Sequence, residues 1–374
     1  MKIGKVSSWL LRVPHMLPLA KEQLHAVFNF IEVETDDGLK GHAMVAYPLR
    51  HGVREYINRE AAPLIVGMDP LRPEEIRSRL LLLTAGKQYH GAWACAMSLI
   101  DVALWDIKGK AFKQPIWKLL GGARAEVPAY ITFGFGHYNT EELIEVATMY
   151  VKEGQTGLKM VVGAGPFMAD SVKRPATDAS IRADAERVRA VREAIGPDID
   201  LMIDANKGLS LAQAIKVANV CEPYNLTWFE DAVLLADPRL MSRLRKESAI
   251  PLAAGSTGTS NLMNLREYLF HEAVDYLQPN VRDIGGYTEG LKAAAIAQAF
   301  SIPIAMGGNY PHLNMHLHAG VPNGGRIEYH MQGWKCYEAV FDGTPPPVNG
   351  KATLPTAPGL GFTPKSGILD LVVD

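Results

Sequence analysis

From residue 127 to residue 329 the sequence repeats one pattern, a short β-rich run followed by an amphipathic segment with helical spacing. The β-rich runs are Val127–Phe133, Gly157–Val162, Asp200–Ala205, Leu226–Glu230, Pro251–Gly255, Tyr276–Pro279, Pro303–Met306 and Arg326–Tyr329. The helical segments include Asp184–Ile195, Leu211–Val220, Arg239–Ser248, Leu262–Ala273 and Thr288–Phe300. Alternating strands and helices form a parallel sheet, and eight repeats in about two hundred residues predict a closed (β/α)-barrel.

The N-terminal region has a different pattern. Phe28–Glu34 alternates apolar and polar residues, an Asp-Asp-Gly turn follows, and Leu39–Ala46 returns, which predicts a β-hairpin. Further along, Gly91–Lys110 places apolar residues three and four positions apart and predicts a long helix. Strands and a helix outside the repeat predict an α+β capping domain.

The C-terminal tail differs from both regions. It is rich in Pro and Gly after Phe341 and ends in the strand-like run Ile368–Val373. We therefore predict an α+β capping domain over residues 1–125, a (β/α)-barrel over 126–340, and a C-terminal segment over 341–374 that returns to the cap.

Two long polar segments are candidates for coverings of the barrel mouth. Pro14–His25 lies between predicted cap strands, and Gly163–Asp178 follows the second predicted barrel strand. Long irregular connections in compact proteins often act as lids, so we predict a lid and a flap at these places.

Composition excludes several classes of protein. A net charge of −2 gives no electrostatic reason to bind nucleic acid or an anionic membrane. No run of 18 apolar residues that could span a membrane occurs, and the N-terminus does not resemble a secretory signal. The three cysteines, Cys95, Cys221 and Cys336, are too widely spaced to suggest disulfides or zinc. We expect a cytoplasmic protein.

The predicted barrel strands end in polar residues, and chemistry in such barrels takes place at that end. Asp204 and Glu230 are 26 residues apart, and Ser256 follows after another 26. One strand–helix repeat per step brings these positions to one mouth. Two neighbouring carboxylates repel each other unless a cation separates them, and Mg²⁺ prefers oxygen ligands. Each acid alone would suit an N-cap of the next helix, but their common phase favours a metal site.

The chain contains the motifs MIDAN (202–206), WFED (228–231) and LQPN (277–280) and the pair Gly285-Gly286. Together with the predicted cap helix, they resemble the mandelate racemase/muconate lactonizing enzyme group of the enolase superfamily. The resemblance covers nearly the whole chain. It implies three acids that hold Mg²⁺, a lysine that binds the substrate carboxylate, and a base that removes the proton alpha to that carboxylate. It also implies a homo-oligomer.

The metal set of this group is only partly matched. Asp204 and Glu230 correspond to the first two ligands, whereas Ser256 stands where the third acid is expected. A serine hydroxyl is a poor Mg²⁺ ligand beside a carboxylate, so we expect weakened binding.

The catalytic set is also incomplete. Lys159 matches the first lysine of a Lys-x-Lys motif, but Val161 replaces the second, which is often a base. Asn280 and Asn309 replace the aspartate and histidine of an Asp–His dyad. Glu328 matches the acid that hydrogen-bonds the enediolate.

His312 and His137 are the candidate replacement bases, because histidine titrates near neutral pH. The alternative for each is a loop residue hydrogen-bonded to backbone or water. We predict that substrate contacts come from Asn206, Asn280, Asn309, His25 and Tyr47. Other loop candidates are His15, Lys21, Arg50, Lys87 and His90.

These residues favour an enzyme that acts on a small-molecule carboxylate by metal-assisted removal of the alpha proton. A single base favours elimination, as in an acid-sugar dehydratase, because racemisation needs access to both faces of the carbon. Two alternatives stay open: a racemase or epimerase of a 2-substituted acid, and a non-catalytic carboxylate-binding relative in which the missing ligand and dyad mark lost activity.

Overall fold

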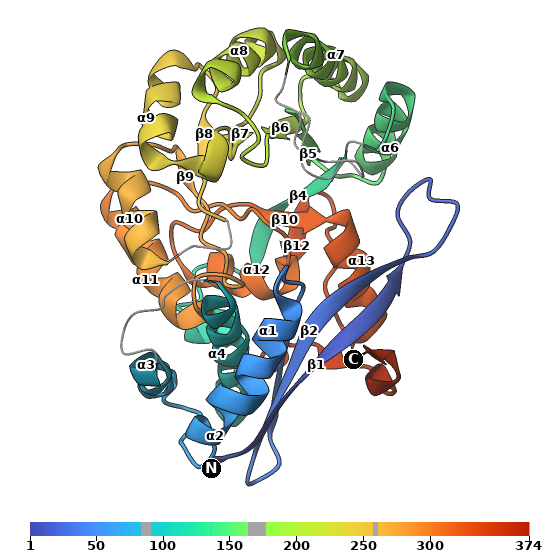
Figure 1. Cartoon of the computed structure of the whole chain (residues 1–374). Coiled ribbons are helices and arrows are strands. Elements are labelled where there is room, and N and C mark those ends of the chain that lie inside the picture. The colour runs from blue at the N-terminus through green and yellow to red at the C-terminus, as the bar shows by residue number, and fades with distance from the viewer. Residues whose placement is uncertain (84–90, 136, 164–176, 257–260, 374) are drawn as a thin grey trace.

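The structure is a computed structural model that describes residues 1–83, 91–135, 137–163, 177–256 and 261–373. The candidate bases Lys87 and His90 lie outside the described residues, as does most of the predicted flap. Figure 1 shows a ring of helices around the barrel strands, with the N-terminal strands and helices placed against one side.

The predicted barrel is present. Its parallel strands are β4 (Glu126–Gly134), β5 (Gly157–Val161), β6 (Asp200–Asp204), β7 (Phe229–Glu230), β8 (Leu252–Ala254), β9 (Tyr276–Leu277) and β10 (Ile327–His330), and β10 pairs with β4. The predicted run Pro303–Met306 forms only bridges at Ile304. Those bridges still close the ring, because the Ala305 N–H donates to the Leu277 carbonyl (2.9 Å) and the Met306 N–H to the Arg326 carbonyl (2.8 Å).

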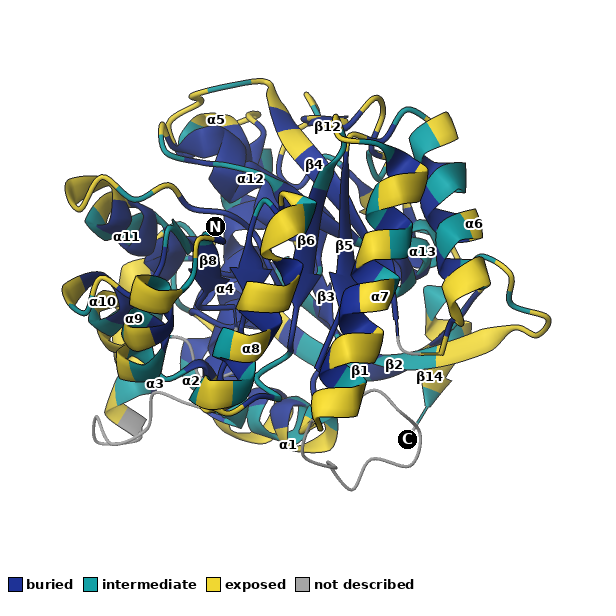
Figure 2. Ribbon diagram, turned by 90° about the horizontal axis from the view of Figure 1, so that it is seen from above, coloured by how far each residue is buried: buried dark blue, intermediate teal, exposed yellow. Residues whose placement is uncertain are grey.

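Helices cover the outside of the strands. They are α6 (Thr140–Lys152), α7 (Asp178–Ile195), α8 (Leu211–Cys221), α9 (Pro238–Glu247), α10 (Leu262–Phe270), α11 (Gly286–Ala299), α12 (Pro311–Gly320) and α13 (Met331–Val340). Helix α7 begins six residues before the predicted Asp184, because Thr177 caps it by accepting from the Ser180 N–H (3.1 Å). Figure 2 shows α7 and α8 with exposed outer faces and buried inner faces, the amphipathic pattern on which the prediction depended.

The cap contains an antiparallel sheet in the order β14-β1-β2-β3. Its strands are β1 (Ile3–His15), β2 (Leu24–Thr35), β3 (Lys40–Val45) and β14 (Val372–Val373). The tail therefore does return to the cap, where Val373 pairs with Leu10. The predicted C-terminal strand is shorter than expected, since Ile368–Leu371 is a 3₁₀ turn. The predicted domain boundaries themselves stay a prediction.

Only the two ends of the candidate lid Pro14–His25 are part of this sheet. His15 pairs with Leu24 and Pro14 with His25, so β1 and β2 extend as a hairpin and only residues 16–23 connect them. The other cap and tail elements are α1 (Arg50–Glu55), the π-helix Tyr56–Ala61, α2 (Ala62–Ile65), α3 (Pro73–Leu83), α4 (Ala92–Ala111), α5 (Ile116–Leu119), β11 (Phe341–Asp342), β12 (Lys351–Thr353) and β13 (Thr363–Pro364).

Helix α4 attaches the cap to the barrel. The Asp101 carboxylate in α4 accepts from the Thr288 N–H at the start of α11 (3.1 Å), and the Gly285 N–H donates to Ser98 Oγ (2.9 Å). A Cβ on Gly286 would lie 2.1 Å from Asp101 Oδ2, and Gly286 has φ +76°. The Gly-Gly pair is therefore needed for close approach of cap and barrel. Within the described part of the chain, no helix is long and apolar enough to cross a membrane.

Candidate active site

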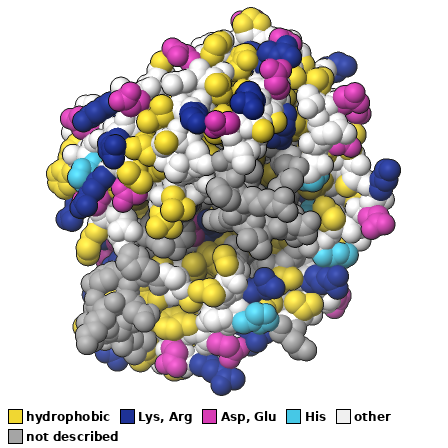
Figure 3. All heavy atoms as spheres, turned by 45° about the horizontal axis from the view of Figure 1, so that its top comes forward, with side chains coloured by type: hydrophobic (Ala, Val, Ile, Leu, Met, Phe, Trp, Pro, Cys, Tyr) yellow, Lys and Arg dark blue, Asp and Glu magenta, His cyan; other side chains and the backbone are white. Residues whose placement is uncertain are grey.

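A cavity of about 700 Å³ lies between the cap and the ends of the barrel strands. The barrel residues that line it include Thr132, Lys159, Val161, Asp204, Asn206, Glu230, Asp231, Ser256, Arg282, Asn309, Glu328 and His330, and the cap residues include Tyr47, Arg50 and Cys95. Lys/Arg and Asp/Glu side chains are interspersed over the described part of the face seen in Figure 3. The charged residues therefore gather inside the cavity and not on the described part of the surrounding surface.

The Lys159 ammonium group is the centre of the charged cluster. Its Nζ lies 2.8 Å from Glu230 Oε1, 3.2 Å from Asp204 Oδ2 and 3.2 Å from Glu328 Oε1. The Lys159 side chain is 1% exposed. The carboxylates predicted to share one mouth therefore do converge, because β5, β6 and β7 are neighbours in parallel register.

Both candidate metal-binding acids also accept hydrogen bonds from the barrel. Trp228 Nε1 donates to Glu230 Oε2 (3.1 Å), and the Asn206 N–H donates to Asp204 Oδ1 (2.7 Å). Burial raises the pKa of Glu230 to about 8, against the opposing effect of Lys159. Burial likewise raises the pKa of the neighbouring Asp231 to about 6.

Glu328 is held as an anion. Burial alone would raise its pKa, but Lys159, His330 and hydrogen bonds from Thr132 and the Asn309 backbone lower the pKa to about 2. Thr132 Oγ1 donates to Glu328 Oε1, and the Asn309 N–H donates to Oε2 (2.9 Å). Both carboxylate oxygens are therefore fixed in position.

The donor set suits a hard divalent cation. Asp204, Glu230 and Glu328 carry three potential negative charges against one ammonium group, which leaves an excess of negative charge in a buried site. No group of three or more His, Cys, Asp and Glu side chains among the described residues is arranged to hold a metal ion. The third protein ligand would have to be Ser256, which is buried and lines the same cavity. Two carboxylates, a hydroxyl and waters fit Mg²⁺.

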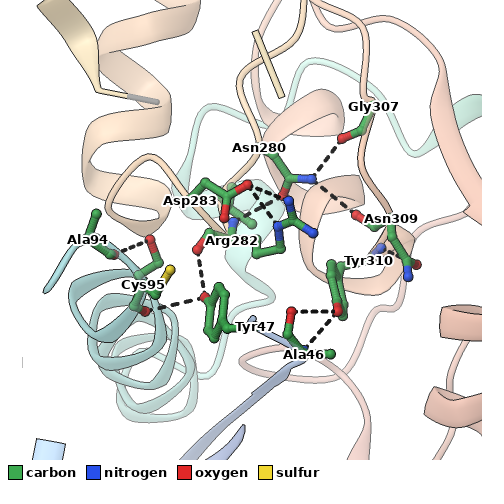
Figure 4. A network of polar contacts seen from close by, with 12 residues as sticks. Ala46, Tyr47, Ala94, Cys95, Asn280, Arg282, Asp283, Gly307, Asn309 and Tyr310 are labelled. Carbon is green, nitrogen blue, oxygen red and sulfur yellow. Dashed lines mark hydrogen bonds and ion pairs between the residues drawn. The ribbon is translucent and has the colours of Figure 1, made fainter. Parts of the chain in front are cut away.

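Asn280 is not placed to bind substrate, contrary to the prediction. Its Nδ2 donates to the carbonyls of Gly307 (2.8 Å) and Asn309 (3.2 Å). Its Oδ1 accepts from the Arg282 N–H (3.0 Å) and from Asn314 Nδ2 (2.8 Å). Both polar atoms of the Asn280 amide are thus used in bonds to neighbouring loops and to α12. Figure 4 shows the bonds to Gly307 and Asn309.

His312 does not line the cavity, so its position contradicts the prediction that it is a base. It lies in the first turn of α12, fully buried, with its ring stacked on Tyr337 (centroids 5.0 Å apart) and edge-on to Phe362. Burial lowers its pKa to about 3. His312 is only three residues beyond Asn309, which lines the cavity, but its ring packs in this aromatic cluster and not at the barrel mouth.

The remaining predicted residues differ in position. Asn206 and Asn309 line the cavity, whereas His137 and His25 are exposed and outside its lining. Tyr47 lines the cavity, but its hydroxyl donates to the Arg282 carbonyl (2.7 Å) and lies 3.3 Å from the Cys95 carbonyl (Figure 4). Tyr47 therefore ties the cap to the barrel.

The cavity residues that the sequence analysis missed include His330 and Arg282. His330 is two residues beyond Glu328 in the same strand, and this spacing could have identified it. Arg282 donates from Nε (2.8 Å) and Nη2 (2.7 Å) to one oxygen of Asp283, and its guanidinium lies 5.5 Å from the ring centre of Tyr310. The residues around Arg282 are shown in Figure 4.

Comparisons with known proteins agree with this architecture. Residues 5–121 match the mandelate racemase/muconate lactonizing enzyme N-terminal domain, and residues 142–368 match the enolase C-terminal domain-like family. Arabinonate dehydratase of Saccharolobus solfataricus is 30% identical over 91% of this chain and 88% of its own. D-galactarolactone cycloisomerase of Agrobacterium fabrum is 30% identical over 97% of this chain and 96% of its own.

Solved structures give the same result. The 3,6-anhydro-D-galactonate cycloisomerase of Zobellia galactanivorans superimposes with a TM-score of 0.87 at 27% identity, covering 100% of both chains. A mandelate racemase/muconate lactonizing enzyme from a marine actinobacterium, in complex with magnesium, has a TM-score of 0.84 at 27% identity, covering 100% of this chain and 99% of its own. The chain belongs to the mandelate racemase/muconate lactonizing enzyme group of the enolase superfamily.

Proposed function

We propose that the protein is a Mg²⁺-dependent acid-sugar dehydratase that removes the proton alpha to a substrate carboxylate. The observation that carries this proposal is the convergence of Asp204, Glu230 and Glu328 on the Lys159 ammonium at the floor of the cavity. Relatives named as dehydratases of arabinonate and of L-talarate and galactarate support the acid-sugar class.

The chain's own residues have separable roles. Asp204 and Glu230 would hold the metal, with Ser256 in the third position. A bound Mg²⁺ would supply positive charge near the substrate carboxylate oxygens, which lowers the cost of losing the alpha proton. Lys159 would bind the same carboxylate, and Glu328, fixed by Thr132 and the Asn309 backbone, would keep the Lys159 ammonium group in position. As an anion, Glu328 has no proton to donate to an enediolate oxygen, so we assign it this positioning role in place of the hydrogen bond expected from the sequence.

Elimination is favoured over racemisation because the usual bases are replaced. Val161 occupies the place of the second lysine of the Lys-x-Lys motif, and the Asn280 amide is fully used in the scaffold. A racemase needs acid–base groups on both faces of the alpha carbon, whereas a dehydratase can work with one.

Two arginines in the cavity suit a polyhydroxy acid. Arg50 begins α1 on the cap side, and among the described residues its side chain has no ion pair. Arg282 uses Nε and Nη2 on Asp283, and no described residue accepts a hydrogen bond from its Nη1. Guanidinium groups hydrogen-bond hydroxyl and carboxylate oxygens well, so these two would contact the sugar chain. From the sequence, we also propose that the protein is cytoplasmic and that it forms a homo-oligomer.

The test is proton exchange. Purified protein with Mg²⁺ is incubated in D₂O with a panel of acid sugars that includes arabinonate and galactarate. Proton NMR follows loss of the C2 proton signal, and a carbonyl reagent detects a 2-keto-3-deoxy product. We expect exchange and product with at least one acid sugar, and neither with Asp204→Asn. Absence of both from the wild type, together with no Mg²⁺ binding, would instead support a non-catalytic relative.

A further inference from the structure

We propose that His330 is the acid–base residue of this active site, a role that rests on the proposed dehydratase function. Its imidazole would remove the alpha proton and then return it to the departing hydroxyl group. The residue lies at the end of β10 and lines the cavity.

The direction of the His330 side chain follows from strand geometry. Alternate residues of a strand point to the same face. Glu328 points into the barrel, where it contacts Lys159 and Thr132, while Tyr329 points outward and packs edge-on to Trp334 (centroids 5.4 Å apart). His330 therefore points inward again, one layer nearer the mouth than Glu328.

The same two-residue spacing defines the layer in which substrate would lie. Val161, Asn206 and His330 follow Lys159, Asp204 and Glu328 at this spacing, and all three line the cavity. Of these three side chains, only the imidazole can accept and release a proton. His330, in β10, therefore replaces the bases that are absent at positions 161 and 309.

The surroundings leave the ring available for chemistry. His330 is half-buried, and its ring packs against Phe135 (centroids 4.8 Å apart, planes tilted by 48°). Its Nδ1 is buried without a hydrogen-bond partner among the described residues. The charged groups that act on it are Glu328, Lys159, Asp204 and Arg282. Burial lowers the pKa of His330 to about 4, so the free enzyme holds it as a neutral imidazole that can accept a proton.

Asp231 is the rival for this role. It lines the cavity, and its Oδ1 is buried without a hydrogen-bond partner among the described residues. Its Oδ2, however, lies 3.8 Å from Lys207 Nζ, and Asp231 is next to the metal-binding Glu230. His330 has no such competing ion pair within the described chain, so we assign the proton transfer to the imidazole.

The reaction balances with one residue. The imidazole takes the C2 proton, and the C–H electron pair moves toward the carboxylate, forming an enediolate that the Lys159 ammonium group stabilises. The electrons then return to form the C2–C3 double bond as the C3–O bond breaks. The departing hydroxyl takes the proton from the imidazolium and leaves as water. The resulting enol tautomerises to a 2-keto-3-deoxy acid, with no oxidant or reductant required.

The experiment compares His330→Ala, His330→Asn and Asp231→Asn with the surface control His271→Ala, which lies at the end of α10 outside the cavity lining. We measure C2 exchange in D₂O, Mg²⁺ affinity by calorimetry and melting temperature. Loss of a positioned base costs about 10²–10⁴-fold in rate. We expect both His330 variants to lose at least 100-fold in exchange, with Mg²⁺ affinity and melting temperature close to wild type, and added imidazole to restore part of the activity of His330→Ala.

The outcomes separate the two proposals. Exchange that persists in both His330 variants would overturn the role of His330 alone, as would loss confined to Asp231→Asn. A His330→Ala variant that loses activity through weaker Mg²⁺ binding, without rescue by imidazole, would also overturn it and indicate a structural role. A wild type that exchanges no C2 proton would overturn the dehydratase proposal and the assignment of His330 with it.

Discussion

Nζ of Lys159 lies 2.8 Å from Oε1 of Glu230, inside a cluster in which three carboxylates share one ammonium group. Lys159 compensates part of the negative charge that the barrel concentrates at its mouth. The proposed function gives it a second role, binding of the substrate carboxylate.

Replacement of Lys159 by methionine should make stability depend on Mg²⁺. Loss of one partner of a buried ion pair costs about 3–5 kcal/mol, because the remaining charge is left uncompensated. A cation that binds the folded state restores stability by mass action. We expect Lys159→Met to melt well below wild type in EDTA and to recover with millimolar Mg²⁺, measured by differential scanning calorimetry. The control is Lys335→Met, which removes a surface pair with Glu338. Equal melting of Lys159→Met with and without Mg²⁺ would contradict a metal site at this cluster.

Ser256 offers a gain-of-function test of the metal site. Mg²⁺ and Ca²⁺ affinities rise with the number of charged ligands, and Ser256 is buried in the same cavity as Asp204 and Glu230. We expect Ser256→Glu to bind Mg²⁺ at least about tenfold more tightly than wild type, which corresponds to about 1.4 kcal/mol. Isothermal titration calorimetry provides the measurement. Ser256→Gln is the matched control, since it has similar size without the charge. If both variants bind Mg²⁺ alike, position 256 does not face the metal.

The parts of this molecule that local pattern determines were predictable, and the parts set by packing between distant segments were not. Strand–helix alternation and the equal spacing of Asp204, Glu230 and Ser256 follow from the repeat, which is why these three residues line one cavity. The outward turn of His312 depends on where α12 begins, at Pro311, and on the aromatic residues of α13 and the C-terminal tail. The full use of the Asn280 amide depends on Asn314 and on the loop that follows Met306.

Alanine at position 286 should loosen the attachment of the cap. The added Cβ would lie 2.1 Å from Asp101 Oδ2 at a backbone φ of +76°. Gly38→Ala separates the two effects, because Gly38 also has positive φ (+87°) but no atom within 4 Å of the added Cβ. Placing an L-residue at positive φ costs about 1–2 kcal/mol by itself. We expect Gly286→Ala to lower the melting temperature clearly more than Gly38→Ala and to increase hydrogen exchange in α4. Equal effects would mean that close approach to Asp101 is not limiting.

The buried histidines of α12 should make the protein sensitive to acid. Burial lowers the pKa values of His312, His316 and His318 to about 3 each. In the unfolded chain these residues take up protons below about pH 6.5, whereas the folded chain does not take them up until about pH 3. The unfolded state thus binds more protons throughout this window, and the free energy of unfolding falls as the pH falls.

His312→Phe should reduce this sensitivity. Phenylalanine suits the contacts with Tyr337 and Phe362 and cannot take up a proton in the unfolded state. Each pKa unit corresponds to 1.36 kcal/mol, so one histidine contributes about 2 kcal/mol to the difference in stability between pH 7.5 and pH 5. Urea unfolding of wild type and His312→Phe at both pH values measures that difference, with His271→Phe on the surface as the control. A difference unchanged in His312→Phe would mean that His312 is protonated in the folded protein, against its placement in the aromatic cluster.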